Sequence, residues 1–110
     1  MKLEDIVIDL TEEAIEYFQK KADNTAGIVI SYNEIMNWCG SHGEWISVTV
    51  QSMKSYDQEQ YFKIDKDGIA IYFQYDAYFM MSGLSKLTID LMRSSHGEFL
   101  VINELFPTVT

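Results

Sequence analysis

Apolar side chains recur at three- and four-residue intervals between residues 11 and 22, and this spacing predicts an amphipathic helix. Ile15 and Phe18 mark its apolar face, whereas Glu16 lies on the opposite, polar face. Thr11 precedes the helix and suits the N-cap position, because its hydroxyl can accept a hydrogen bond from an amide of the first turn. Two glutamates follow in that turn and two lysines occupy the last one, as the helix dipole favours.

The rest of the chain follows the patterns of β-strands. Residues 28–32 are apolar on both faces of the expected strand, which is typical of a buried strand, while residues 46–50 alternate as in a half-buried strand. The segment Asp-Lys-Asp-Gly at 65–68 predicts a hairpin turn with Gly68 at a positive φ angle. The expected strands cover residues 3–9, 28–32, 46–50, 61–64, 69–73, 87–91 and 99–102.

Two further segments interrupt the strands. Residues 37–43 are polar and contain glycines, which indicates a loop, and Cys39 lies within it. Asp76 is a candidate N-cap for a short helix over residues 77–81. These elements predict a mainly β protein with α-helices (α+β), a compact β-sandwich or flattened barrel of about six to seven strands with one N-terminal amphipathic helix and a short second helix. We expect residues 1–110 to form a single domain.

The charge of the chain narrows the classes of partner. Seventeen acidic residues against eight basic ones give a net charge of −9. Nucleic-acid binding requires a basic surface that neutralises phosphates, so we expect no nucleic-acid partner, and docking on anionic lipid is disfavoured in the same way. No apolar run approaches the roughly 18 residues of a membrane span, and the first residues do not resemble a signal peptide. A single cysteine forms no internal disulfide, so the expected location is the cytoplasm.

Cys39 has the widest range of candidate roles. As a free thiol it can pack as a small hydrophobic side chain without reacting. As a thiolate it can bind iron or zinc, and His42, three residues later, supplies an imidazole that suits the same metals. Two ligands do not complete a site, so His96, a carboxylate or Cys39 of a second copy would have to contribute. A cysteine–histidine nucleophile is the enzymatic alternative, for which the sequence specifies no substrate.

The remaining candidate residues, which are aspartates, aromatic residues and methionines, are expected to shape the fold rather than to bind a ligand. Asp65 and Asp67 begin like a calcium loop, but Ile69 occupies the position of the third ligand, so a turn is expected there. Most members of one aromatic cluster are expected in the core, with one or two at a subunit interface. The cluster consists of Trp38, Trp45, Tyr72, Tyr75 and Tyr78. Core filling is also expected of the methionines Met36, Met80, Met81 and Met92.

Five short motifs follow one another along the chain. They are Leu-Thr-Glu-Glu-Ala at 10–14, Trp-Cys-Gly-Ser-His-Gly at 38–43, Asp-Gly-Ile-Ala-Ile at 67–71, Leu-Thr-Ile-Asp-Leu at 87–91 and Gly-Glu-Phe-Leu-Val-Ile-Asn at 97–103. Their order and spacing resemble the HesB/IscA family, the A-type iron–sulfur carriers, in which the cysteine loop commonly reads G-C-S-G and the last strand G-F-x-(F/I)-x-N. The resemblance covers essentially the whole chain and implies a HesB-like fold.

The chain departs from this family after Asn103. Carriers of the family place a C-x-C pair beyond the final strand, so that three thiolates per subunit can hold iron or a cluster, whereas no cysteine follows Asn103 here. The resemblance therefore implies a divergent HesB/IscA-like protein, non-enzymatic, related to iron–sulfur cluster biogenesis but not a conventional carrier. Any metal binding would be weak and would use Cys39 and His42. Iron or an iron–sulfur cluster is the cofactor considered, and the sequence requires neither.

Two alternative functions remain open from the sequence. A non-catalytic interaction or scaffold module that self-associates would keep the fold without the ligands, and a small cysteine-dependent enzyme is the third candidate. A homodimer, with or without a cluster shared through two Cys39 thiolates, is the expected oligomer. Other protein partners are compatible with the apolar segment 105–108.

Overall fold

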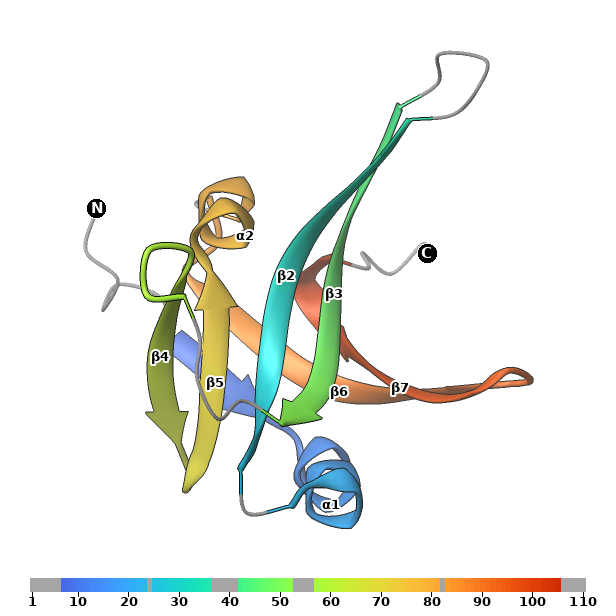
Figure 1. Cartoon of the computed structure of the whole chain (residues 1–110). Coiled ribbons are helices and arrows are strands. Elements are labelled where there is room, and N and C mark those ends of the chain that lie inside the picture. The colour runs from blue at the N-terminus through green and yellow to red at the C-terminus, as the bar shows by residue number, and fades with distance from the viewer. Residues whose placement is uncertain (1–6, 24, 37–41, 53–56, 82, 106–110) are drawn as a thin grey trace.

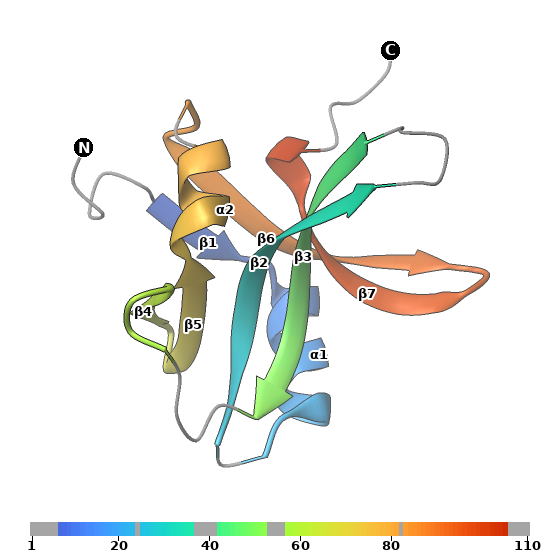
Figure 2. The same ribbon diagram turned by 45° about the horizontal axis from the view of Figure 1, so that its top comes forward.

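The protein, seen in a computed structural model, forms two mixed β-sheets that face each other, with a helix at each end (Figures 1 and 2). The structure describes residues 7–23, 25–36, 42–52, 57–81 and 83–105, with the backbone alone for 34–36 and 42–44. The elements in chain order are β1 (Val7–Leu10), α1 (Glu12–Lys21), β2 (Ala26–Met36), β3 (His42–Ser52), β4 (Tyr61–Lys66), β5 (Ile69–Gln74), α2 (Tyr75–Met80), β6 (Lys86–Ser94), β7 (Gly97–Ile102) and the 3-10 turn η2 (Asn103–Leu105). The predicted α+β class, with seven strands and a short second helix, is confirmed.

Both sheets join strands that are distant in sequence. The three-stranded sheet has the order β1-β6-β7, and its parallel β1–β6 pair runs from Val7 opposite Lys86 to Leu10 opposite Ile89. The four-stranded sheet has the order β3-β2-β5-β4, in which only β2 and β5 are parallel. The chain therefore begins in the three-stranded sheet, builds all of the four-stranded sheet, and returns to complete the first. No helix within the described ranges is long and apolar enough to cross a membrane.

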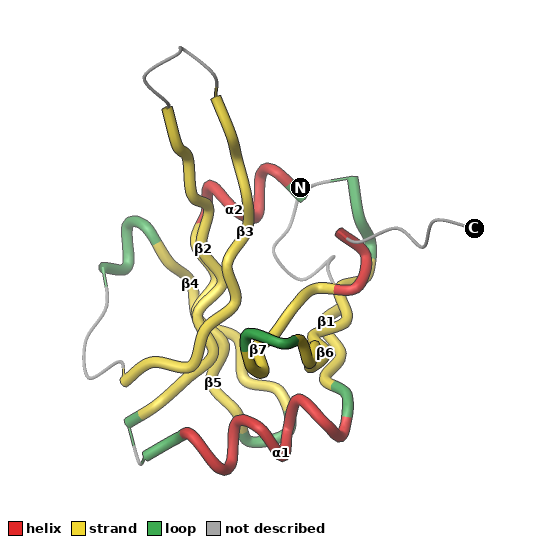
Figure 3. Tube along the Cα trace, turned by 90° about the vertical axis from the view of Figure 1, so that its right-hand side faces the viewer, coloured by secondary structure: helices red, strands yellow, loops and turns green. Residues whose placement is uncertain are grey.

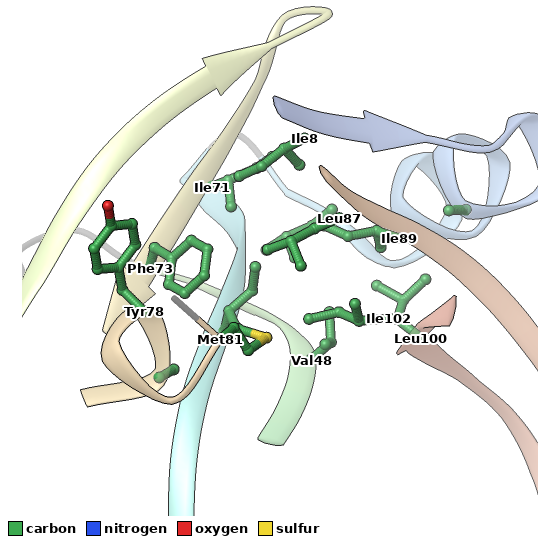
Figure 4. Close-up of a cluster of buried hydrophobic side chains, with 14 of the residues drawn as sticks. Ile8, Val48, Ile71, Phe73, Tyr78, Met81, Leu87, Ile89, Leu100 and Ile102 are labelled. Carbon is green, nitrogen blue, oxygen red and sulfur yellow. The ribbon is translucent and has the colours of Figure 1, made fainter. Parts of the chain in front are cut away.

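The hydrophobic core lies between the two sheets (Figure 4). Both sheets supply it, because strands place alternate side chains on the inner face. Helix α1 adds Ala14 to this core, and α2 adds Ala77 and Tyr78 at the other end. Burial stabilises the fold by about 1.5–3 kcal/mol for each large aliphatic or aromatic side chain. Among the described residues, the largest fully buried side chains are Phe73, Ile28, Ile30, Ile71, Leu87, Ile89 and Ile102.

Two local predictions are confirmed by the structure. The hydroxyl of Thr11 accepts a hydrogen bond from the amide of Ala14 at 3.2 Å, as expected of the N-cap of α1. Asp67 and Gly68 form the two-residue turn between β4 and β5, with φ angles of 54° and 79°. Two positive φ angles match the type I′ turn, whose twist fits a β-hairpin. The turn is tighter than predicted, because Asp65 belongs to β4.

Two predicted boundaries differ from the structure, and one lies outside the described residues. β2 and β3 pair over eleven residues each, so His42 and Gly43, expected in a loop, belong to β3. Their polar and glycine-rich composition indicates a loop, but the antiparallel hydrogen bonds of the hairpin continue past the core. The predicted cap of α2 is also wrong, since Gln74 is the N-cap and Asp76 lies in the first helical turn. Residues 3–6 of the expected first strand lie outside the described ranges.

The methionines are divided between core and surface. Met81 is buried, as expected, whereas Met80 and Met92 are 47% and 37% exposed, so the expectation of core filling is wrong for these two. Met80 lies on the short helix α2 and Met92 on strand β6, and both side chains are partly open to solvent. Tyr72 and Tyr78 are buried in agreement with the expectation for most aromatic residues. The side chain of Met36 lies outside the description.

Gly27 offers a test of the close approach between β2 and β5. A Cβ atom at this position would lie 2.5 Å from Cε2 of Tyr72 and 2.9 Å from the carbonyl oxygen of Ala70. We expect Gly27→Ala to lower the free energy of unfolding by about 1–3 kcal/mol, because the backbone and a buried ring would have to move. Urea denaturation measures this change. Gly83→Ala is the control, since its Cβ would meet no atom within 4 Å, and an equal loss there would contradict the argument.

Candidate functional site

The β2–β3 hairpin is the longest arm of the molecule. Its ladder runs from Ala26 opposite Ser52 to Met36 opposite His42. The end that carries Met36 and His42 projects beyond the two sheets (Figures 1 and 3). Cys39 belongs to the connection of residues 37–41 between these strands, which lies outside the described residues. Its predicted role as a ligand therefore stays a prediction.

The predicted histidines lie on different hairpins. His42 is the first residue of β3, where its backbone pairs with Met36, and its side chain lies outside the description. His96 lies in the exposed turn between β6 and β7, where its amide donates a hydrogen bond to the hydroxyl of Ser94 at 3.1 Å. The β6–β7 hairpin extends in a different direction from the β2–β3 hairpin (Figures 1 and 2). His96 is therefore not brought to the described end of the β2–β3 arm.

Metal ligands of the usual kinds do not gather elsewhere in the described part of the chain. Among the residues described, no three His, Cys, Asp or Glu side chains are grouped so that they could hold a metal ion. Any site built on Cys39 would need ligands from the β2–β3 arm or from another chain.

Asp90 connects three elements next to the end of the last strand. Its Oδ1 accepts hydrogen bonds from the hydroxyl of Thr11 at 2.9 Å and the amide of Leu91 at 2.8 Å, and its Oδ2 accepts one from the side-chain amide of Asn103 at 3.1 Å. The bond from Asn103 is the main cause of a lowered pKa, which partial burial opposes and the other two bonds reinforce. Asp90 thus fixes the start of α1 and the start of η2 to β6.

Glu104 fixes the η2 turn in a similar way. Its carboxylate accepts a hydrogen bond from the amide of Thr88 at 2.6 Å and another from the Thr88 hydroxyl at 2.9 Å. Partial burial raises the pKa of Glu104, but these bonds, one from its own amide and the nearby charge of Lys86 outweigh it, so the pKa is lowered. The chain therefore leaves β7 in a defined direction. Glu104 was missed in the sequence, because no local pattern marks a carboxylate whose partner is sixteen residues away.

Three of the five motifs that carry the family resemblance meet at this place. Thr11 comes from the helix-start motif, Asp90 from the leucine–aspartate strand and Asn103 from the last strand. Their shared hydrogen bonds give these residues a structural role in joining distant segments. Their presence in this sequence is accounted for by the fold, without any chemistry of a bound group.

The two carboxylates predict a pH dependence of stability. Because folding lowers the pKa of Asp90 and Glu104 below their ordinary values of 3.8 and 4.5, their contribution is present above those values and is lost as the pH falls through the lower, folded-state values. Asp90→Asn should lower the free energy of unfolding at pH 7 by about 1–2 kcal/mol and should flatten its decline in acid. Denaturation series between neutral and acid pH measure both effects. Glu59→Gln, at an exposed position in the turn before β4, is the control and should follow the wild type; an unchanged acid slope in Asp90→Asn would contradict the assignment.

Comparison with solved structures supports the fold expected from the motifs. SufA of Escherichia coli, described as involved in biosynthesis of iron–sulfur clusters, matches with a TM-score of 0.54 and 14% identity over 93% of this chain and 83% of that one. IscA with a [2Fe-2S] cluster matches with a TM-score of 0.51 and 14% identity over 87% and 80%. At this identity the likeness establishes the fold alone. A search among curated proteins finds no match.

Comparison with family models assigns the sequence itself to a family. The model of the CC/Se motif containing family matches residues 6–105, which is nearly the whole chain. The sequence has one cysteine and so contains no Cys-Cys pair. The resemblance to the A-type carriers is confirmed at the level of fold, and the chain belongs to the CC/Se motif containing family.

Proposed function

We propose that this protein is a non-enzymatic relative of the iron–sulfur cluster biogenesis proteins that binds iron or a small cluster weakly through Cys39 and His42, and is not a conventional three-thiolate carrier. The observation that carries the proposal is the carrier fold combined with a single cysteine, which falls in the connection at the end of the β2–β3 arm. A fold alone does not fix a function, so the ligands decide how far the likeness extends.

The number of thiolates limits what one chain can hold. Iron–sulfur clusters generally take four protein ligands, mostly cysteines, although two histidines replace two cysteines on one iron in some [2Fe–2S] centres. One chain offers Cys39 and His42, whereas two chains offer two thiolates and two imidazoles. The proposal therefore includes a homodimer that shares the metal or cluster. Such a site assembles only when two chains meet, which makes binding weak.

The described residues that follow β7, Asn103–Leu105, offer no metal ligand in place of the C-x-C pair of the carriers. Glu104 has both carboxylate oxygens engaged by Thr88, and Leu105 has no metal-binding group. A carboxylate already committed to two hydrogen bonds would have to lose them before it could bind a metal. This supports a ligand set that comes from the β2–β3 arm.

Anaerobic reconstitution with iron and sulfide tests the proposal on the full chain. The wild type is expected to show thiolate-to-iron charge-transfer absorption and bound iron, together with a shift toward the dimer in size-exclusion chromatography. Cys39→Ser should abolish these signals, because it removes the only thiolate. His42→Ala should weaken iron retention.

His96→Ala is the matched control, because His96 lies on the β6–β7 hairpin and should leave the absorption unchanged. A colourless, metal-free wild type would overturn the metal role and favour the interaction module. Equal colour in Cys39→Ser would show that the iron is bound elsewhere.

A further inference from the structure

An apolar groove runs along the line where the two sheets approach each other at β3 and β7. It has a volume of about 310 Å³, within the range of small ligand sites. The buried side chains of Val48, Leu100 and Ile102 form its floor. Trp45 and Phe99 form its walls and are 44% and 41% exposed, respectively. Large aromatic side chains that are half exposed beside a buried apolar floor are typical of binding surfaces.

Both strands beside the groove are edge strands. β3 ends the four-stranded sheet and β7 ends the three-stranded sheet. Among the described residues, no backbone hydrogen bond joins these two strands. Each strand therefore presents backbone N–H and C=O groups along the groove, and such an edge can pair with an added extended segment.

The groove continues toward a cationic end. A second hollow of about 230 Å³ shares Val48, Thr49, Phe99 and Leu100 with the groove and adds Tyr17 and Lys21 of α1. Lys21 is the only charged residue among the described residues that line these two hollows, and its Nζ lies 5.7 Å from the centre of the Tyr17 ring. The apolar floor thus leads to a positive charge.

A third hollow beyond Lys21 contains charges of both signs. Lys20, Lys21 and Arg93 line it, which is three of the eight basic residues of the chain, together with Glu13, Glu16 and Glu98. Arg93 is paired with Glu98 at 3.3 Å. The ion pairs seen among the described residues include neither Lys20 nor Lys21. Glu13 and Glu16 are likewise absent from these pairs, so the charges of the third hollow balance. The local attraction for a negative ligand group is therefore Lys21, where the second hollow adjoins the groove.

We propose that the groove binds an extended peptide segment of a partner protein, paired with the free edge of β3, with apolar side chains against Trp45 and Phe99 and an acidic residue beside Lys21. From Trp45 to Val50 a strand spans about 17 Å, so five or six residues of extended peptide fit. The net charge of −9 opposes a large acidic partner, so the acidic group of the ligand is limited to one residue. Salt screens charges that lie more than about 8–10 Å away, so the nearby ammonium group of Lys21 can still attract one acidic side chain of the peptide. This site does not depend on Cys39.

Selection from a library of displayed random heptapeptides tests the proposal on the full chain, with counter-selection on Phe99→Asp. Enriched peptides should carry apolar residues at alternate positions and an Asp or Glu near one end. A synthetic peptide of the enriched sequence should bind at least tenfold more weakly to Phe99→Asp and to Trp45→Ala than to the wild type. Phe79→Asp is the matched control, because Phe79 is 65% exposed on α2 and does not line the groove.

A second pair of variants tests the charge, and amide exchange tests the strand pairing. Lys21→Glu should weaken peptide binding about tenfold at low salt, whereas Lys63→Glu on β4 should not. Bound peptide should slow hydrogen exchange of β3 amides. The proposal is overturned if no peptide is enriched, if Phe99→Asp and Phe79→Asp lose binding equally, or if β3 exchange is unchanged. It is also overturned if the wild type dimerises and Phe99→Asp is monomeric, since a second copy would then occupy the groove.

Discussion

The contact between the inner faces of two small mixed sheets is the interaction on which this structure depends. Sheets of three and four strands bury one face well only against another layer. Here each sheet supplies that layer for the other, and α1 and α2 close the ends of the contact. The ion pairs of Asp9, one to Lys66 of the other sheet and one to Lys86 of its own sheet, add little by comparison. Lys66 and Lys86 lie 3.9 and 3.2 Å from the carboxylate of Asp9, but all three side chains are substantially exposed.

The parts of the fold that depend on neighbouring residues could be predicted from the sequence. The cap at Thr11 and the turn at Asp67–Gly68 each follow from side-chain chemistry and backbone preference within a few residues. The start of α2 could not be predicted in this way. Gln74 begins the helix without capping it, because its Oε1 accepts a hydrogen bond from the amide of Tyr32 at 2.6 Å, forty-two positions away. The extension of β3 to His42 likewise depends on pairing with β2 rather than on its own composition.

In the candidate site, too, some residues could be identified from the sequence and others only from the structure. Cys39 and His42 were identified from residue chemistry and from the order of the motifs, since a thiol and an imidazole are recognisable without coordinates. The anchoring role of Asp90 needed the structure, because its partners Thr11 and Asn103 lie at opposite ends of the chain. Trp45 and Phe99 belong to strands that the pattern predicted well. That they line one groove follows from the strand order, which brings β3 and β7 side by side at the sheet edges, and strand order is not encoded in hydrophobic periodicity.

The parallel pairing of β1 with β6 has a consequence for synthesis of the chain. Val7 pairs with Lys86, so the first strand emerges from the ribosome long before its partner is made. Until then, the apolar residues of β1 and α1 have no three-stranded sheet to join, while the whole four-stranded sheet can already form. Contacts of such long sequence separation slow folding and leave strand edges exposed in the meantime. The nascent chain is therefore expected to complete its sandwich only after the last third has left the ribosomal tunnel.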